Sequence, residues 1–473
     1  MSSMRRHPRR RPLAAEQSHR GPLGLMRDTF VRGGHARPPA HCARRGPRVL
    51  AAVLLACAAA AAPGLPFGIA PGPAAAEPPA HPGPRLAAGG PDADAYGAGN
   101  GYPLGDRSTF ASSAYIVGSF SHLDGIFDAR LIRRATTPST LRRAAAEPTL
   151  RYVYAGEALT LDDHLARHPT TGLLVARADT ILIERYQYAR HERHRLASWS
   201  MAKTVTSMLL GIAIGEGRIR SIDDPAATYV PALAGTEYGR TSLRHLLRMS
   251  SGVRFIERYT GQDDVARLLT DSIGHASAGG VDTVKPFNQR ERPSGTTFAY
   301  ASAETQVLGL VLRGAVGRTV ADYFQEKIWE PIGAEADATW LVDRAGQEAT
   351  WCCLNAVLRD YARVGLLLAH DGHWRGRQVV PAAWLADATR AHGPQRLKVG
   401  FEPANPEFAA YGYQVWILPG ERRTFFLSGL LGQLIFVDPA SRLVLVHTAV
   451  RTRPADLGAE IALWRAVVRE LGR

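Results

Sequence analysis

The sequence predicts an α/β (α+β) fold, in which an antiparallel sheet flanked by helices is interrupted by an inserted all-helical lobe. Segments with strand character occur near both ends of the globular region, first at 171–188 and again between 411 and 450. The residues between them, 200–380, carry helical periodicity and loop signals instead. We therefore expect the two ends to share one sheet and the middle to form a lobe, with a cleft where they meet.

The first 48 residues form a strongly basic segment. They contain twelve arginines and two acidic residues, and so supply ten of the fourteen net positive charges of the chain. An apolar stretch at 49–62 and the small residues Ala74-Ala75-Ala76 follow, in the order typical of a secretory signal. The apolar part is shorter than the roughly 20 residues of a spanning helix. We predict a basic n-region with a signal peptide or membrane anchor over 1–76 and an exported protein, periplasmic or extracellular. A lipoprotein lipidated at Cys57 is the alternative.

The rest of the chain has a balanced composition. It carries only about four net charges, so the high isoelectric point does not indicate a nucleic-acid partner. Residues 77–104 are rich in Pro, Gly and Ala and are predicted to be a linker before a folded domain at 105–473. Outside the export segment the only cysteines are Cys352 and Cys353, which we interpret as two small buried side chains rather than a vicinal disulfide or a metal site. Nothing in the sequence indicates an oligomeric state.

The elements of the domain follow in order. Residues 171–188 have apolar runs on both sides of a polar turn at 177–180, which is typical of a β-hairpin. A nearly wholly apolar helix begins after Ser200. Arg359, Asp360 and Arg363, at helical spacing, are interpreted as structural residues on a solvated face. The further predicted helices are 241–252, 302–317, 320–333, 356–372 and 455–471, and the further predicted strands are 411–419, 422–429, 432–439 and 442–450.

A lysine interrupts the apolar helix after Ser200. Lys203 is one of only four lysines, and it lies three residues after Ser200, so the two side chains share a helix face. A lysine amine removed from water can lose its proton, whereas an arginine cannot. A serine hydroxyl becomes a good nucleophile when a neighbouring base takes its proton, and the first turn of a helix offers backbone N–H groups to an oxyanion. We therefore predict Ser200 as nucleophile and Lys203 as its base.

Residues 198–225, followed by 245–253, resemble the serine hydrolases of the beta-lactamase-related superfamily. This superfamily includes class C beta-lactamases, D,D-peptidases, esterases and 6-aminohexanoate-dimer hydrolases, and the resemblance is closest to the last group. It runs over most of 105–473. It implies a beta-lactamase/transpeptidase-like fold and an acyl-enzyme formed on the serine of the Ser-x-x-Lys motif, without cofactor or metal.

The second motif of this superfamily is Tyr-x-Asn or Tyr-x-Ser, which Tyr300, Ala301 and Ser302 match. The resemblance implies that Tyr300, coupled to Lys203, carries a proton between Ser200 and the leaving group. We expect the cationic amine to favour the ionised phenol and so to lower its pKa. Ser302 is expected to contact substrate. Considered without the resemblance, Tyr300 is a half-buried aromatic residue.

The third motif, Lys-Thr-Gly or His-Thr-Gly on an edge strand, is altered here. The matching residues 425–429 read Phe-Phe-Leu-Ser-Gly, with no cation before Gly429. In beta-lactamases that cation holds the substrate carboxylate, so its absence argues against an efficient beta-lactamase. The resemblance implies that Gly429 lines the site and that the backbone N–H of Leu430 joins that of Ser200 in an oxyanion hole.

We conclude from the sequence that this is an exported serine hydrolase acting on a small-molecule amide or ester, similar to 6-aminohexanoate-dimer hydrolases and carboxylesterases. A D,D-peptidase, a weak beta-lactamase or a non-catalytic penicillin-binding-like cell-wall sensor are the alternatives. The chain has sixteen histidines, but it has neither a Gly-x-Ser-x-Gly elbow nor His-Glu-x-x-His spacing. A catalytic Ser-His-Asp triad and a zinc site are therefore not favoured.

Overall fold

The computed structural model describes residues 83–392, 410–452 and 457–473. The predicted n-region, signal peptide or anchor and the lipidation site at Cys57 lie outside the described residues. Within these three ranges, no helix combines the length and the apolar character needed to cross a membrane.

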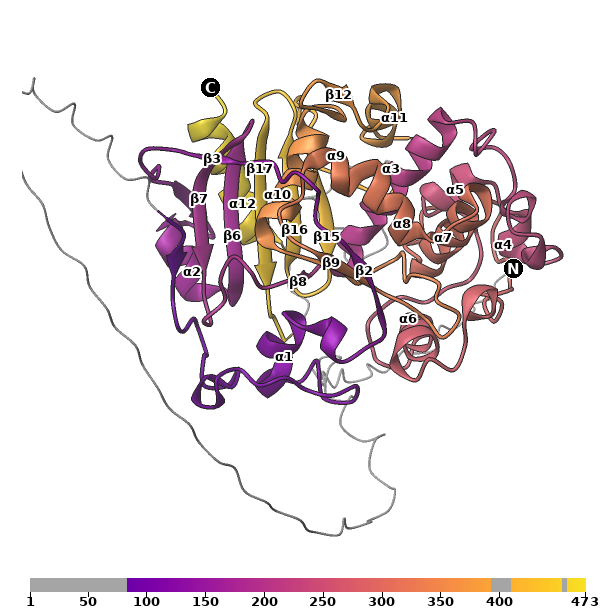
Figure 1. Cartoon of the computed structure of the whole chain (residues 1–473), viewed down its shortest axis with the longest axis horizontal. Coiled ribbons are helices and arrows are strands. Elements are labelled where there is room, and N and C mark those ends of the chain that lie inside the picture. The colour runs from indigo at the N-terminus through magenta and orange to yellow at the C-terminus, as the bar shows by residue number, and fades with distance from the viewer. Residues whose placement is uncertain (1–82, 393–409, 453–456) are drawn as a thin grey trace, which may run out of the picture. The chain divides into compact units, whose positions relative to one another are not determined.

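An antiparallel sheet fills the left part of the described domain in the view of Figure 1. Its strands in spatial order are β1 (Arg85–Leu86), β7 (Thr180–Tyr186), β6 (Thr170–Arg177), β17 (Leu443–Ala449), β16 (Gln433–Asp438), β15 (Phe425–Gly429), β14 (Trp416–Ile417) and β13 (Ala410–Tyr411), with β3 (Arg142–Arg143) also paired to β7. Only β1 and β3 run parallel to their neighbour. The pairing of β6 with β17, in which Leu173 lies opposite His447, joins the N- and C-terminal strands as predicted.

The predicted hairpin is confirmed as β6 and β7. Arg177 pairs with Thr180, and the turn between them contains Ala178 in the left-handed region. The hairpin leads into a second sheet whose strands in spatial order are β2 (Ala129–Ile132), β9 (Ala338–Leu341), β10 (Leu354–Ala356) and β8 (Leu196–Ala197). Because β8 comes directly before Ser200, this small sheet holds the start of the apolar helix.

The inserted helical lobe is also confirmed. It lies beyond β15, on the side of the main sheet away from β7 (Figure 1). Its helices are α3 (Ala202–Gly215), α4 (Glu237–Arg240), α5 (Leu243–Leu247), α6 (Asp264–Leu269), α7 (Ser302–Val316), α8 (Val320–Phe324) and α9 (Glu330–Ile332). Helix α7 packs against α3 and α5. The helices outside this lobe are α1 (Ser113–Phe120), α2 (Leu161–Arg167), α10 (Leu358–Ala369), α11 (Ala382–Ala388) and α12 (Gly458–Leu471).

Helices α10 and α12 cover opposite faces of the main sheet. Ile435 and Phe436 are neighbours on β16 and therefore point to opposite faces. Ile435 lies against Gly365 of α10, where an added Cβ atom would come within 2.9 Å of it. Phe436 stacks on Trp464 of α12, with ring centroids 5.5 Å apart. The sheet is thus covered on both sides, and its central strands β16 and β17 are buried along their whole length.

Residues 83–104 differ from the predicted linker, because the described chain packs on the domain before residue 105. Strand β1 pairs with β7, and Tyr96 and Tyr102 are buried with their rings 5.7 and 5.9 Å from that of Tyr188. The two buried tyrosines of the segment pack on Tyr188 of the domain, and two aromatic residues are too few to give the segment an apolar periodicity.

Candidate active site

Lys203 lies in the first turn of α3 with only 1% of its surface exposed. Its Nζ donates hydrogen bonds to Ser200 Oγ (2.8 Å), Ser302 Oγ (3.0 Å) and the Trp351 carbonyl (2.9 Å). All three acceptors are neutral, and no salt bridge to Lys203 occurs within the described ranges. The amine is therefore held in place without a permanent ionic partner.

Burial sets the protonation of this amine. It lowers the pKa of Lys203 to about 8, and the nearby Glu257 carboxylate opposes the shift. With that pKa, roughly one molecule in ten carries a neutral amine at pH 7. An ordinary lysine would offer far fewer, so this site is suited to proton transfer.

Ser200 lies in a short 3₁₀ helix, Trp199–Met201, just before α3. The preceding Trp199 has φ of 44°, which is uncommon for a residue with a side chain. Such backbone outliers occur preferentially at functional sites. The half-buried Ser200 hydroxyl is thereby presented to Lys203 from a sharp turn.

The end of β15 packs directly on this turn. A Cβ atom at Gly429 would lie 2.2 Å from the Ser198 carbonyl oxygen, so only glycine allows this approach. The half-buried Leu430 follows at once, and Leu431 and Gly432 continue the turn with φ of 64° and 99°. The structure therefore brings the predicted oxyanion residues Gly429 and Leu430 to the Ser200 turn.

Tyr300 enters the same site from the residues just before α7. Its hydroxyl shares a hydrogen bond with the Ser200 side chain, and Lys203 Nζ lies 4.9 Å from the centre of its ring. The ring stacks on Trp416 at 5.6 Å. The three side chains predicted to be catalytic thus meet, although they come from two segments about a hundred residues apart in the chain.

The ionisation of Tyr300 differs from the expectation. Burial raises the pKa of its phenol, the Glu257 carboxylate raises it further, and only the hydrogen bond with Ser200 lowers it. The phenol is therefore neutral in this structure. The cost of burying a phenolate outweighs any gain from the neighbouring Lys203 amine.

Ser302 does not lie where a substrate-binding residue was expected. It is fully buried, and its hydroxyl accepts a hydrogen bond from Lys203 and donates one to Glu257 Oε1 (2.8 Å). Its backbone N–H donates to Glu257 Oε2 (2.7 Å). The hydroxyl and the backbone N–H of Ser302 are therefore both engaged in hydrogen bonds inside the protein, and Ser302 bridges Lys203 and Glu257.

Sequence reasoning missed Glu257. This half-buried carboxylate accepts the two hydrogen bonds from Ser302 and a third from the Tyr259 hydroxyl (2.8 Å). Burial raises the pKa of Glu257, and Lys203 opposes that change. No local pattern marks it, because its partner Ser302 is 45 residues away in the chain.

The interpretation of the two cysteines was half wrong. Cys352 and Cys353 are buried as expected, but they form a vicinal disulfide. The peptide bond between neighbours leaves little freedom to bring two sulfur atoms together, so adjacency alone could not favour the bond. The disulfide directly follows Trp351, whose carbonyl accepts the Lys203 hydrogen bond.

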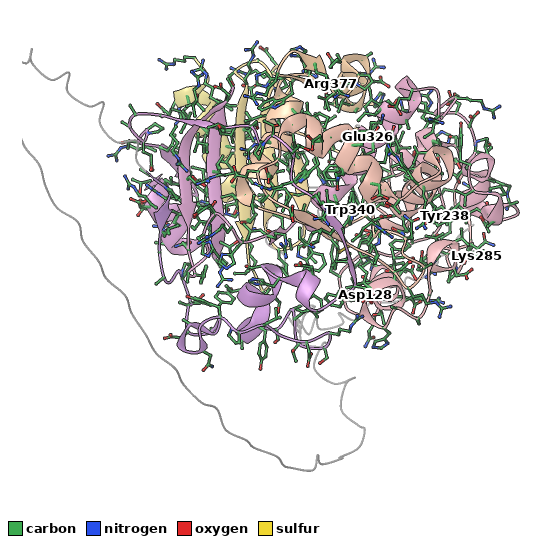
Figure 2. The ribbon with its side chains drawn as sticks, in the orientation of Figure 1. Asp128, Tyr238, Lys285, Glu326, Trp340 and Arg377 are labelled. Carbon is green, nitrogen blue, oxygen red and sulfur yellow. A yellow bond between two sulfur atoms is a disulfide. The ribbon has the colours of Figure 1, made fainter. Side chains whose placement is uncertain are left out.

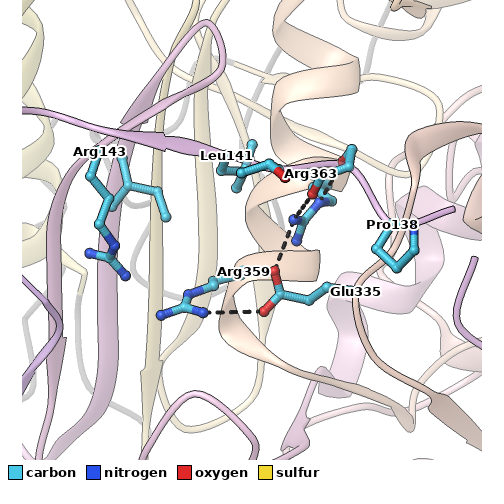
Figure 3. Close-up of a pocket in the computed structure, with 9 residues that line it drawn as sticks. Pro138, Leu141, Arg143, Glu335, Arg359 and Arg363 are labelled. Carbon is cyan, nitrogen blue, oxygen red and sulfur yellow. Dashed lines mark hydrogen bonds and ion pairs between the residues drawn. The ribbon is translucent and has the colours of Figure 1, made fainter. Parts of the chain in front are cut away.

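The placement of three charged residues of α10 on a solvated face was wrong. Asp360 and Arg363 are buried, with 0% and 1% of their surface exposed, and they form an ion pair with each other. Arg359 and Arg363 both reach Glu335, as Figure 3 shows. Their role is structural, as predicted, but they act inside the domain.

These arginines line a cavity of about 240 Å³ (Figure 3). Arg143 and Arg359 both pair with Glu184, so acidic partners balance the arginines around the cavity. Neither Ser200 nor Lys203 contributes to its lining. It is therefore separate from the candidate active site and has no unpaired charge to attract a ligand.

One cluster among the described residues has the donor atoms for a metal ion. It consists of the buried residues His164, His447 and Glu460, whose ligand atoms lie within 4.8 Å of one another. Arg451 forms an ion pair with Glu460 there. A divalent cation would add to the charge of this arginine in a buried place, so the cluster is a poor metal site.

Comparisons with known proteins agree with this geometry. A family model described as Beta-lactamase matches residues 158–469. The 6-aminohexanoate-dimer hydrolase of Paenarthrobacter ureafaciens is 29% identical over 330 residues, which cover 67% of this chain and 83% of that one.

Solved structures of the same kind share the fold. A Bacillus anthracis protein assigned to the 6-aminohexanoate-dimer hydrolases superposes with a TM-score of 0.67 at 23% identity, covering 76% of this chain and 94% of that one. EstCE1, a hydrolase with promiscuous acyltransferase activity, superposes with a TM-score of 0.52 at 16% identity, covering 64% and 94%. These likenesses confirm the predicted beta-lactamase/transpeptidase-like fold.

Proposed function

The chain belongs to the beta-lactamase family of hydrolases, and from this we propose that it cleaves an amide or ester bond of a small molecule through an acyl-enzyme on Ser200. The observation that carries the proposal is the 2.8 Å hydrogen bond between Lys203 Nζ and Ser200 Oγ, in a place where burial lowers the pKa of the amine to about 8. A base with that pKa is well matched to proton transfer near neutral pH.

In the acylation step, neutral Lys203 takes the proton of Ser200 as the hydroxyl oxygen attacks the substrate carbonyl. The backbone N–H groups of Ser200 and Leu430 hold the resulting oxyanion. The close approach of Gly429 to the Ser200 turn supports this pairing.

The leaving group then needs a proton. The neutral phenol of Tyr300 is hydrogen-bonded to the Ser200 side chain and is the group placed to donate it. Lys203, protonated in the first step, returns a proton to Tyr300. In deacylation the Tyr300–Lys203 pair activates water in the same way, which regenerates free Ser200.

We propose 6-aminohexanoate-dimer hydrolase-like and carboxylesterase-like substrates as the substrate class. The matching relative is named for a linear amide, and β15 has no cation to hold the carboxylate of a beta-lactam. The site wall near Ser200 is aromatic, since Tyr300 stacks on Trp416. A linear, largely apolar acyl chain suits such a wall better than a strongly charged one.

We also propose that the protein is exported. The Cys352–Cys353 disulfide supports this, because disulfides persist in oxidising compartments such as the periplasm and the extracellular space. Cell fractionation tests the location, and recovery of the protein only from the cytoplasm contradicts it.

A fluorophosphonate probe tests the nucleophile. We expect the wild-type protein to be labelled and Ser200→Ala to remain unlabelled while keeping its melting temperature. Side-by-side turnover of p-nitrophenyl esters, nitrocefin and the 6-aminohexanoate dimer then sorts the substrate classes. Fast nitrocefin hydrolysis would favour a beta-lactamase, and a folded wild-type protein without any labelling would favour a non-catalytic sensor.

A further inference from the structure

Two carbonyl groups on either side of the vicinal disulfide hold the catalytic turn. The Trp351 carbonyl accepts the hydrogen bond from Lys203 Nζ (2.9 Å), and the Leu354 carbonyl accepts one from the Ser198 backbone N–H (2.9 Å). One of these bonds fixes the candidate base and the other fixes the strand that leads into Ser200. Only the two cysteines separate the two carbonyls.

The carbonyls of the two cysteines accept hydrogen bonds from β9 instead. Trp340, labelled in Figure 2, donates its indole N–H to the Cys352 carbonyl (2.9 Å). The Leu341 N–H donates to the Cys353 carbonyl (3.1 Å). The carbonyls at 351 and 354 thus serve the Ser200 turn, while the two between them serve β9.

This change in the direction of successive carbonyl groups is accompanied by an unusual backbone conformation. Cys353 has φ of 69°, in the left-handed region where residues other than glycine are uncommon. A chain without a cross-link would have many other conformations open to it at such a position, and a disulfide removes conformational freedom from the segment it closes. Here the closed segment is the dipeptide whose conformation decides where the Trp351 carbonyl points.

We propose that the Cys352–Cys353 disulfide is a positioning element for the candidate active site, which holds the Trp351 carbonyl against Lys203. The proposal rests on the proposed function, in which Lys203 is the base. Without the cross-link, the turn relaxes and the amine loses one of its three acceptors. The protonated amine loses more than the neutral one, because a hydrogen bond to a charged donor is the stronger. Nζ is also less firmly held next to Ser200 Oγ.

The first measurement is chemical. Denatured, unreduced protein is alkylated and digested with trypsin, and the peptide 345–359 is weighed. We expect this peptide to be unalkylated and lighter by two hydrogen atoms than its dithiol form. Alkylation of both cysteines without reduction overturns the proposal.

The second measurement compares wild type with Cys352→Ser/Cys353→Ser in the full-length protein. We expect the rate of fluorophosphonate labelling to fall about tenfold or more. We also expect the Lys203 pKa, read by NMR of isotope-labelled lysine, to fall by about one unit. The chain has only four lysines, so the signal is readily assigned with Lys203→Arg. Wild-type labelling and a wild-type Lys203 pKa in the double variant overturn the proposal.

Controls separate positioning from general stability. Ile461→Ala, in α12 on the main sheet, removes a fully buried side chain and is expected to lower the melting temperature while leaving the Lys203 pKa and the labelling rate unchanged.

If the double serine variant does not fold, Cys352→Ser/Cys353→Asn replaces it, because asparagine tolerates the left-handed conformation. This variant is expected to label at an intermediate rate, and a wild-type rate overturns the need for the cross-link. A wild type that never labels refutes the proposed function, while the NMR comparison still decides the positioning role.

Discussion

Replacing Glu257 by Gln removes one negative charge near Lys203, the proposed base, while keeping the shape of the side chain. Ser302 Oγ lies 3.0 Å from Lys203 Nζ and 2.8 Å from Glu257 Oε1, so charge and amine are at most about 6 Å apart. At an effective dielectric constant of about 20, two unit charges at that distance attract by about 3 kcal/mol. The three hydrogen bonds donated to Glu257 favour its ionised form.

This attraction supports the protonated form of Lys203, so its loss lowers the pKa of the amine by about two units. The wild-type pKa of about 8 should thus fall to about 6 in Glu257→Gln. In the proposed mechanism the neutral amine is the active form, so kcat/KM should rise with pH through this pKa. We therefore expect the rising limb of the pH–rate profile to move to lower pH by about the same amount.

The assay is kcat/KM for a p-nitrophenyl ester between pH 5 and 10, with the fluorophosphonate labelling rate as a second profile. The matched control is Ser302→Ala, which keeps the carboxylate charge but removes one of the three acceptors of the amine, and which should move the limb by about one unit, half as far. The position of the limb does not depend on how much total activity the variant retains. A Glu257→Gln limb that stays near pH 8 would refute the electrostatic coupling of Glu257 to Lys203.

Three further variants test the remaining roles. Lys203→Arg keeps the charge but cannot release a proton, so kcat should fall by about 10³-fold, and turnover at the wild-type rate would exclude Lys203 as the base. Tyr300→Phe should slow hydrolysis of amides by about 10²-fold and p-nitrophenyl esters much less, because p-nitrophenolate leaves without a proton; equal losses would contradict a role in leaving-group protonation. The pKa of Lys203 is about 8 when folded and 10.5 as a free side chain, so the unfolded state binds the proton more readily between these values. Wild-type stability should therefore increase by about 3 kcal/mol from pH 8 to 10.5, in denaturant titrations, and Lys203→Met should lack this increase.

The parts of the site that could be predicted from the sequence are those that depend on local spacing. Ser200 and Lys203 share one turn, so a three-residue separation is enough to predict their contact. The sheet and lobe could be predicted because apolar runs and helical periodicity are also local. Tyr300 comes from another segment, and only the resemblance to a known family places it in the cleft.

The features that were missed depend on tertiary packing. Helical spacing predicts that Asp360 and Arg363 are neighbours, but not that their helix is covered on both sides, so their burial could not be read from it. The Cys352–Cys353 bond occurs with a left-handed backbone at Cys353. Residues with a side chain rarely adopt this conformation, so the sequence does not predict it. Glu257 gains its role only when its loop is placed beside α7.

The position of Ser302 shows how a buried lysine with a carboxylate neighbour can still serve as the base that we propose. A direct ion pair at about 3 Å would attract by about 5 to 6 kcal/mol at the same effective dielectric constant, roughly twice the value at about 6 Å. The difference is about two pKa units, which would keep Lys203 protonated up to about pH 10. The neutral hydroxyl of Ser302 keeps the charges apart while joining them by hydrogen bonds. Burial lowers the pKa of the amine and the Glu257 carboxylate opposes part of that shift, and the resulting pKa of about 8 suits the proposed base near neutral pH.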